Sequence, residues 1–252
     1  MLTYPSPIFG PVHSRRLGIS LGINLLPADG KVCSFDCLYC ECGFNADKRP
    51  HSPMPTRSEV ATALERQLTM MCEQGTLPDV LTFAGNGEPT LHPQFPLIVD
   101  DVLSLRDKYC PLSKVSLLSN ATMAHRPEVH AAMLRLDNNI LKLDTVSAEY
   151  IRRVDRPQGG YDVDGIVETL RSFDGHVTIQ TMFMTGVAVD NTTDDYVEPW
   201  LKAIAYIRPQ AVMVYTVDRR TPAEGLFKAA PETLNNICQR VRDLGINCTA
   251  SY

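Results

Sequence analysis

Three cysteines, Cys33, Cys37 and Cys40, lie close together in the segment from Lys31 to Glu41. Their thiolates are soft ligands that suit zinc or iron–sulfur clusters. A structural zinc site usually takes four ligands, whereas this segment supplies three from one motif. A cubane of four irons held by three thiolates keeps one iron open, and an open iron can bind and reduce a substrate or cofactor. The spacing therefore predicts a reactive iron–sulfur site.

The remaining cysteines do not complete a zinc site. They are scattered singly, at Cys42, Cys72, Cys110, Cys238 and Cys248. Zinc ribbons and fingers combine two Cys-x-x-Cys or Cys/His pairs, and the sequence has no second pair of that kind. A disulfide framework is typical of short secreted chains, whereas this chain has 252 residues and no recognisable signal peptide. Ligation by Cys42 would block the open iron, so we do not expect Cys42 to be a ligand. We expect one cluster.

Composition favours a globular enzyme. Hydrophobic residues make up 44% of the chain and charged residues 21%, and no apolar run approaches the ~20 residues needed to cross a bilayer. We expect a cytoplasmic protein that is not bound to membranes, in which residues 1–252 form a single domain, with a core of about 18–220 and a closing helix at 231–244. The net charge of -5 argues against broad, nonspecific binding to nucleic acid.

Short apolar runs alternate with amphipathic helical stretches, which is the pattern of consecutive βα units and a parallel sheet. Strands are predicted at 19–26, 80–84, 114–118, 139–143, 177–183 and 211–217. Helices are expected where apolar residues recur at helical spacing, near 60–71, 98–109, 127–136, 166–173, 197–204 and 234–244. The fold class is therefore α/β, a partial (β/α)6 TIM-like barrel with parallel strands. In such barrels the chemistry lies at the C-terminal rim of the strands.

Polar residues fall where the predicted strands end. They are the cysteine segment, Gly85-Asn86-Gly87-Glu88-Pro89, Ser119, Asn120, Asp144, Gln180, Met182, Tyr215, Asp218 and Arg219. Because parallel strands end at the same rim, we expect these side chains to surround one site.

In order and place, the Cys33-x3-Cys37-x2-Cys40 motif followed by Gly85-Asn-Gly-Glu-Pro89 resembles the radical S-adenosylmethionine (SAM) superfamily. The resemblance spans nearly the whole chain. The segments Gly10 to Gly18, Gly85 to Pro93 and Arg153 to Pro157 are also similar to tRNA wyosine synthases. Those relatives carry further upstream cysteines for a second cluster, and here no cysteine precedes Cys33.

The resemblance implies one [4Fe-4S] cluster on the three cysteines, with SAM bound at the open iron. An external electron donor of the flavodoxin or ferredoxin type supplies one electron, which cleaves SAM to a 5'-deoxyadenosyl radical. That radical removes hydrogen from a substrate, which the sequence leaves open between a small molecule, a peptide and RNA, with a modified RNA base as one candidate. No catalytic residue is assigned.

The expected cofactor contacts come from five predicted strand ends. Tyr39 can pack its ring against adenine. The turn formed by Gly85, Asn86, Gly87 and Glu88 can bring backbone close to the ligand and grip the methionine ammonium. The other expected contacts are Ser119, Asn120, Lys142, Asp144, Gln180 and Met182. Lys142 and Asp144 share one face of their strand, so they could bind the charged end of the cofactor or simply satisfy each other.

Basic residues follow two of the strands. Arg153, Arg156 and Arg219, together with Tyr215, are candidates for binding substrate. Because arginine forks recognise phosphate and carboxylate, these residues indicate an anionic substrate. Local ion pairs with Asp155, Asp162 and Asp218 are the alternative.

Two other functions remain open from sequence. An activase that makes a glycyl radical on a partner protein shares the cysteine spacing. A non-catalytic iron–sulfur or zinc protein would not cleave SAM.

Overall fold

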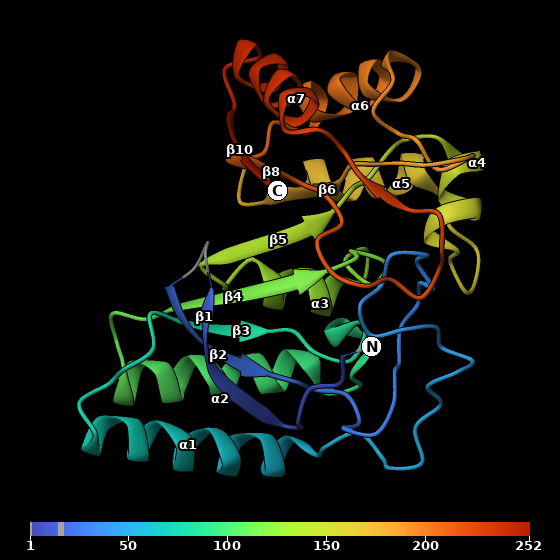
Figure 1. Cartoon of the computed structure of the whole chain (residues 1–252). Coiled ribbons are helices and arrows are strands. Elements are labelled where there is room, and N and C mark those ends of the chain that lie inside the picture. Colours follow the sequence, from blue (N-terminus) through green and yellow to red (C-terminus); the bar gives the residue numbers. More distant parts are fainter. Residues whose placement is uncertain (1, 15–17) are drawn as a thin grey trace.

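The computed structural model describes residues 2–14 and 18–252, and within them an eight-stranded sheet runs in the order β1-β2-β3-β4-β5-β6-β8-β10 (Figure 1). β1 (Ile8–Ser14) is antiparallel to β2 (Gly18–Ile23), and every later pairing in this sheet is parallel. The other strands are β3 (Val80–Phe83), β4 (Lys114–Ser119), β5 (Asn138–Lys142), β6 (Thr178–Met182), β8 (Ala211–Tyr215) and β10 (Asn247–Ser251). The order has two edges, so the barrel is open.

The six predicted strands are confirmed as β2 to β6 and β8. The two edge strands escaped prediction for local reasons. β1 contains Pro11 and a register irregularity between Phe9 and Val12, which breaks the alternation. β10 has the sequence Asn-Cys-Thr-Ala-Ser and lacks large apolar side chains. A further two-stranded sheet pairs β7 (Met184–Thr185) with β9 (Phe227–Lys228).

The predicted helices are confirmed and pack along the sheet. They are α1 (Arg57–Glu73), α2 (Phe95–Tyr109), α3 (Pro127–Met133), α5 (Val163–Arg171), α6 (Asp194–Ile207) and α7 (Pro231–Asp243). α1 begins with a capping box, in which Thr56 and Glu59 each bind the other's backbone amide. Shorter helical segments cover Pro89–Leu91, α4 (Ala148–Tyr150) and a π-turn at Ile151–Asp155. Among the described residues, no helix is long and apolar enough to span a bilayer.

Two groups of buried side chains hold these elements together. The main core joins the sheet to its helices and contains Leu21, Phe83, Leu117 and Trp200. A smaller group includes Phe35, Cys37, Tyr39, Tyr150 and Met182. Figure 1 shows the segment between β2 and α1 on the side toward which the arrowheads of β4 and β5 point. The second group therefore anchors the cysteine segment at the rim where the strands end.

Candidate functional site

Two segments that follow neighbouring strands meet at the cysteine loop, which we define as residues 31–43. Val32 forms a parallel bridge with Gly87. Its amide donates to the Asn86 carbonyl at 3.0 Å, and its carbonyl accepts from the Glu88 amide at 3.0 Å. Gly87 has φ +133°, and a Cβ there would lie 1.9 Å from the Val32 oxygen. The glycine is thus required because the cysteine loop itself passes against it, whereas the sequence suggested an approach to the ligand.

We predict that Gly87→Ala weakens the attachment of the cysteine loop. Strain at a positive φ and the clash with Val32 should destabilise the fold by about 2 kcal/mol or more, which lowers Tm by roughly 5 °C. Iron content after anaerobic reconstitution should fall with it. Gly160→Ala is the matched control, since a Cβ there meets no atom within 4 Å. Equal iron content and Tm in the two variants would contradict the structural role of Gly87.

The opposite side of the cysteine loop is held by the end of the π-turn and the residues that follow it. The Asp36 amide donates to the Asp155 carbonyl at 3.0 Å, and the Leu38 amide donates to the Val154 carbonyl at 2.9 Å. The Gln158 amide in turn donates to a loop carbonyl at 2.8 Å. The loop is therefore fixed between the ends of β3 and β5. Sequence reasoning missed this contact, although the segment Arg153 to Pro157 carried part of the family resemblance.

The three motif cysteines are free thiols in different surroundings. Cys37 is buried, while Cys33 and Cys40 are half-buried. The Cys33 sulfur accepts from the Asn120 side-chain amide at 3.7 Å and from the Phe35 backbone amide at 3.5 Å. Burial raises the pKa of Cys33 to about 12 and that of Cys37 well above its usual value. A metal that binds these sulfurs must therefore displace their protons.

Cys40 has a different environment because Cys42 and Lys31 lie beside it. The hydrogen bond from Cys42 lowers the pKa of the Cys40 thiol to about 6, against the effect of burial and with help from the Lys31 ammonium. Lys31 is buried and donates to the Gly43 carbonyl at 2.7 Å. The Cys42 thiol also contacts the Gly85 carbonyl at 3.6 Å. Cys42 is therefore near the motif.

The sequence predicts that Cys33, Cys37 and Cys40 are the cluster ligands and that the fourth iron is open. Replacement of Cys42 by serine should then leave the iron content at the wild-type level. Iron and sulfide analysis after anaerobic reconstitution measures this. A Cys42→Ser protein as poor in iron as Cys40→Ser would show that Cys42 is a ligand.

The donor set fits a cluster. Among the described residues, no group of three or more His, Cys, Asp or Glu side chains is arranged to hold a single metal ion. A single tetrahedral ion with ligands at ~2.3 Å needs sulfurs roughly 3.8 Å apart, whereas each thiolate of a cubane binds a different iron and stands farther away. Three free thiols on a loop held from both sides supply the soft ligands that such a cluster needs.

Glu88, Ser119 and Asn120 are brought together, as the sequence predicted, but they bind one another. The buried carboxylate of Glu88 accepts from the Ser119 hydroxyl at 2.8 Å and from the Asn120 backbone amide at 2.7 Å. Burial raises the pKa of Glu88, while these hydrogen bonds oppose the shift. The Asn120 side chain reaches Ser34 at 2.9 Å as well as the Cys33 sulfur. Glu88 thus joins the ends of β3 and β4 beneath the cysteine loop.

Asn86 takes a structural position. Its side-chain amide is fully buried and donates to the carbonyls of Tyr4 at 2.9 Å and Pro27 at 2.8 Å, while its oxygen accepts from the Tyr4 amide at 2.8 Å. Both N–H donors are used in these bonds. The side chain of Asn86 therefore secures the N-terminal segment, and the contact of this turn with the cofactor stays a prediction.

Lys142 lies at the centre of a buried polar network. Its ammonium donates to Asp144, to the Tyr39 hydroxyl and, at 2.9 Å, to Asp155. Burial alone would lower the pKa of Lys142, but the two carboxylates raise it, so the ammonium stays charged. Burial also raises the pKa of Asp155 to about 7, with Lys142 opposing and Asp144 adding to the shift. Of the two readings that the sequence left open, the structure displays mutual pairing of Lys142 and Asp144.

The same network fixes the aromatic ring of the motif. The Tyr39 hydroxyl donates to Asp144, and the Lys142 ammonium lies 4.9 Å from the Tyr39 ring centre. Burial and the Asp144 charge raise the pKa of Tyr39, so the phenol remains protonated. The other oxygen of Asp144 accepts from the Met182 amide at 3.0 Å. Asp155, which the sequence analysis considered only as a partner for arginine, belongs to the same buried network because it accepts from Lys142.

Met182 and Gln180 are two residues apart in β6, so they share one face of the strand, as predicted. Their surroundings differ. Gln180 is paired in register with Lys142 of β5, and Met182 with Tyr215 of β8. Asn191, which the sequence did not single out, is fully buried and donates to the Met182 carbonyl at 2.8 Å. This amide secures the end of β6, where Met182 meets the pocket described next.

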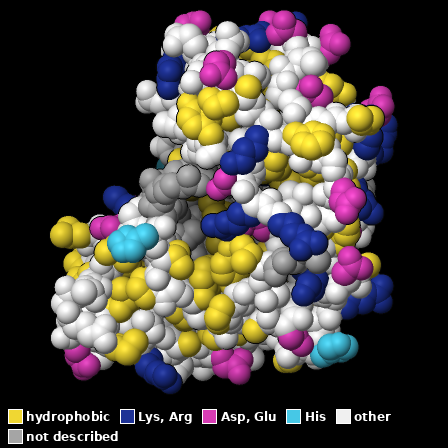
Figure 2. Space-filling model, in the orientation of Figure 1, with side chains coloured by type: hydrophobic (Ala, Val, Ile, Leu, Met, Phe, Trp, Pro, Cys, Tyr) yellow, Lys and Arg dark blue, Asp and Glu magenta, His cyan; other side chains and the backbone are white. Residues whose placement is uncertain are grey.

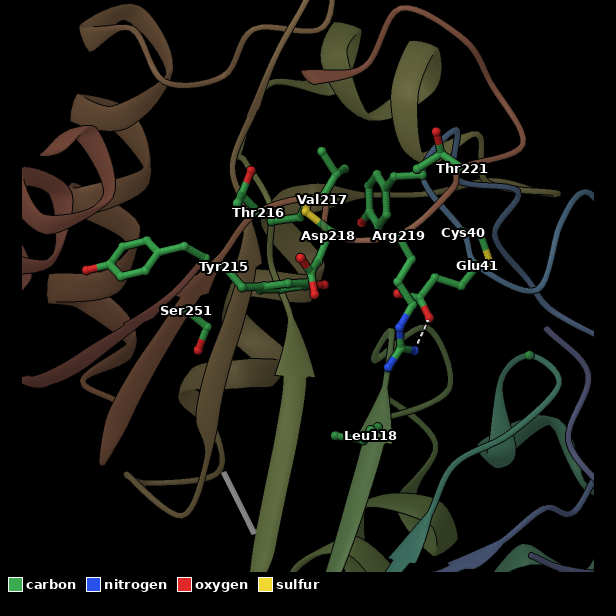
Figure 3. Close-up of a pocket in the computed structure, with 14 residues that line it drawn as sticks. Cys40, Glu41, Leu118, Tyr215, Thr216, Val217, Asp218, Arg219, Thr221 and Ser251 are labelled. Carbon is green, nitrogen blue, oxygen red and sulfur yellow. Dashed lines mark hydrogen bonds and ion pairs between the residues drawn. The ribbon is translucent and has the colours of Figure 1, made fainter. Parts of the chain in front are cut away.

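A pocket of about 400 Å³ opens beside the cysteine loop (Figure 3). Predicted residues that line it are Tyr39, Cys40, Gly87, Met182, Tyr215 and Arg219, and unpredicted ones include Glu41, Leu118, Val217, Thr221 and Ser251. Arg219 extends to Glu41 in Figure 3, and their ion pair measures 2.7 Å. One side of the pocket thus comes from the motif segments and the other from β8, the residues after it, and the end of β10.

The predicted arginines do not form one group. Arg153 and Arg156 are not among the residues that line this pocket. Arg153 lies in the π-turn and pairs with Glu149 at 3.1 Å, and Arg156 stacks over the Phe44 ring at 5.1 Å. The expected loop after β5 is helical, which directs these side chains elsewhere. Arg153 and Arg156 thus lie outside the lining of this pocket, and their role in binding substrate stays a prediction. Figure 2 shows Lys and Arg side chains near the central hollow of one face.

Comparisons with known proteins agree with this arrangement. The model of the family described as the radical SAM superfamily matches residues 29–204. A UPF0026 protein of Helicobacter pylori (strain J99) is 31% identical over 216 residues, covering 84% of this chain and 66% of that protein. A protein of Brachyspira hyodysenteriae named GTPase Obg is 27% identical over 221 residues, covering 86% of this chain. The chain spans 31% of the length of that relative and about two thirds of the other.

Solved structures share the fold at low sequence identity. A radical SAM methyltransferase from Sphaerobacter thermophilus gives a TM-score of 0.67 at 15% identity, covering 92% of this chain and 66% of that one. The structure of TYW1 with a lysine–pyruvate adduct bound gives 0.60 at 12% identity, covering 89% and 73%. The likeness to these structures shows that this chain shares their partial-barrel fold. This chain belongs to the radical SAM superfamily.

Proposed function

We propose that Cys33, Cys37 and Cys40 hold one [4Fe-4S] cluster and that SAM binds beside it in the pocket. The observation that carries the proposal is the bridge between Val32 and Gly87, because it joins the cysteine loop to the turn after β3. Cys40 and Gly87 consequently line the same pocket. When bound, the reduced cluster and SAM supply a 5'-deoxyadenosyl radical, the family's means of removing hydrogen from a substrate.

The motif side of the pocket would hold the cofactor. Tyr39 and Met182 offer an aromatic ring and a thioether for the adenine, and Gly87 leaves its backbone open to the methionine end. Lys142 and Asp144 act through Tyr39, whose hydroxyl they hold, so we assign them to orienting that ring. Glu88 and Asn120 fix the cysteine loop from below. Ser119 binds Glu88 through its hydroxyl, and Gln180 lies beside Lys142 in the register of the sheet.

The β8 side of the pocket would hold the substrate. Tyr215, Thr221 and Ser251 bring hydroxyls, and Arg219 brings a guanidinium that is 61% exposed at its side chain. Glu41 already binds this guanidinium, so an anion can bind there by displacing the Glu41 carboxylate or by sharing the guanidinium with it. We therefore propose a substrate with a phosphate or carboxylate group at the end nearest Arg219. A modified RNA base with its phosphate meets this requirement, as does a small anionic metabolite.

An activity screen tests the anionic substrate. Reduced holoenzyme with SAM is given fractions of a cell extract separated on an anion exchanger, and release of 5'-deoxyadenosine is measured. The stimulating fraction should be retained by the exchanger, and Arg219→Gln should lower the stimulation at least ten-fold. Arg66→Gln, an exposed arginine on α1, is the control. Stimulation by an unretained fraction, or full stimulation of Arg219→Gln, would rule out the assignment.

The atom that is attacked is identified by isotope transfer. A stimulating compound prepared with deuterium should pass the label to 5'-deoxyadenosine, because hydrogen removal forms the new C–H bond of that product. An electron donor of the flavodoxin or ferredoxin type is expected to replace dithionite in the same assay. Release of unlabelled product from a fully deuterated compound would show that the compound is not the substrate.

A further inference from the structure

Cys238 and Cys248 lie in contact, outside the residues that line the candidate site. Cys238 belongs to α7 and Cys248 to β10. Their sulfurs are 2.7 Å apart, closer than the ~3.5–4.0 Å at which non-bonded heavy atoms pack. The exposed fractions of the two residues are 0% and 5%. Simple apolar packing of two cysteines does not require so close a contact.

The pattern of buried residues shows which face of α7 packs against which face of β10. In α7, Cys238 shares the buried face with Leu234, Ile237 and Val241. In β10, Cys248 is buried while its neighbours Asn247 and Thr249 are exposed. The helix face and the strand face therefore pack with the two thiols opposite each other.

A basic side chain lies beside the pair. The Arg242 guanidinium donates to the Cys248 carbonyl at 2.7 Å. The hydrogen bond from Cys248, assisted by the Arg242 charge, lowers the pKa of the Cys238 thiol. A larger thiolate fraction makes a cysteine more reactive toward oxidants. Only a small oxidant can reach so buried a sulfur.

We propose that Cys238 and Cys248 are a redox pair that hydrogen peroxide converts to a reversible disulfide. The Cys238 thiolate attacks peroxide and forms a sulfenic acid, with release of hydroxide that takes up a proton to become water. The Cys248 sulfur then attacks the sulfenic sulfur, and a second water leaves. In total, two thiols and one peroxide give one disulfide and two waters.

The disulfide would act on the edge of the sheet. β10 pairs with β8 at one end of the strand order, and Ser251 and Tyr252 beyond Cys248 line the pocket. A covalent bond to α7 would restrain this part of the pocket wall. The inference rests on the two thiols alone, so it stands or falls independently of the proposed cluster and substrate.

Peptide mapping tests the pair directly. The full chain, purified anaerobically, is titrated with hydrogen peroxide. It is then denatured in the presence of iodoacetamide, which alkylates the remaining free thiols, and digested with trypsin without reductant. Cleavage after Lys228, Arg240 and Arg242 isolates peptides 229–240 and 243–252, each with one cysteine. We expect a linked species two hydrogens lighter than their sum, which dithiothreitol separates.

Exposed Cys72 provides the internal reference. If Cys238 and Cys248 are recovered alkylated, or singly over-oxidised, at doses that oxidise Cys72, the proposal is overturned. Cys248→Ser should lose the linked species, and Cys72→Ser should keep it. The wild-type result decides the matter even if Cys248→Ser fails to fold.

Discussion

Serine at any one of Cys33, Cys37 or Cys40 should reduce the iron bound after anaerobic reconstitution from about four atoms per chain to below one. Each of these thiols is a candidate ligand, and a cubane with two thiolates lacks the ligands that hold it in place. SAM cleavage should fall by at least about 100-fold, because the electron that cleaves SAM would come from this cluster. Iron and sulfide analysis, with the visible spectrum of the cluster, measures the loss.

The matched control for this series is Cys72→Ser. Cys72 is an exposed free thiol on α1, and its sulfur contacts only the Tyr109 carbonyl, at 3.5 Å, among the hydrogen bonds found in the described chain. It should keep full iron content. A wild-type protein that binds near eight irons would contradict the single cluster, and full iron content in a Cys37→Ser protein would contradict the ligand assignment.

Lys142→Met should destabilise the fold strongly. It leaves Asp144 and Asp155 buried without their cation, and breaking such a buried pair costs about 3–5 kcal/mol. For a chain of this size the fall in Tm is about 10 °C. The Tyr39 hydroxyl loses the Lys142 donor as well, so SAM affinity should fall together with stability.

The destabilisation of Lys142→Met should grow with pH. Lys142 opposes the upward shift in the pKa of Asp155, so its removal raises that pKa further above its value in the unfolded chain. The folded variant then binds a proton that the unfolded chain releases above about pH 4, and stability falls as pH rises. Denaturant midpoints for wild type and variant at pH 5.5 and pH 8 measure this difference.

Lys108→Met is the control for the buried network. Lys108 pairs with Glu65 on the surface at 2.8 Å, with side chains 60% and 45% exposed, so its loss should cost under about 1 kcal/mol. An effect of Lys142→Met no larger than that of Lys108→Met would contradict the account of the network.

Local patterns in the sequence were enough for the repeating part of the fold. The capping box at Thr56 and Glu59 marked the start of α1, and buried apolar runs marked β2 to β6 and β8. The edge strands were missed because edges tolerate proline, irregular register and small polar residues. The α4 and π-turn segment was missed because it is too short to show a helical period.

The site was predictable where residues act from the ends of strands. Cys40, Gly87 and Met182 meet at one pocket because parallel strands end at one rim. Partner choice was not predictable in the same way. The sequence places Asp155 next to arginines, yet tertiary packing gives it to Lys142, and Arg219 finds Glu41 from a distant segment. Such pairings depend on side-chain directions that local patterns do not contain.

The central claim is that the three cysteines support reductive cleavage of SAM in this pocket. The most direct measurement is the appearance of 5'-deoxyadenosine when anaerobically reconstituted protein is given SAM and dithionite. We predict its formation by wild type and Cys72→Ser, and its absence with Cys40→Ser. Protein that carries about four irons per chain and reduces normally, yet forms no 5'-deoxyadenosine with or without cell extract, would contradict the claim.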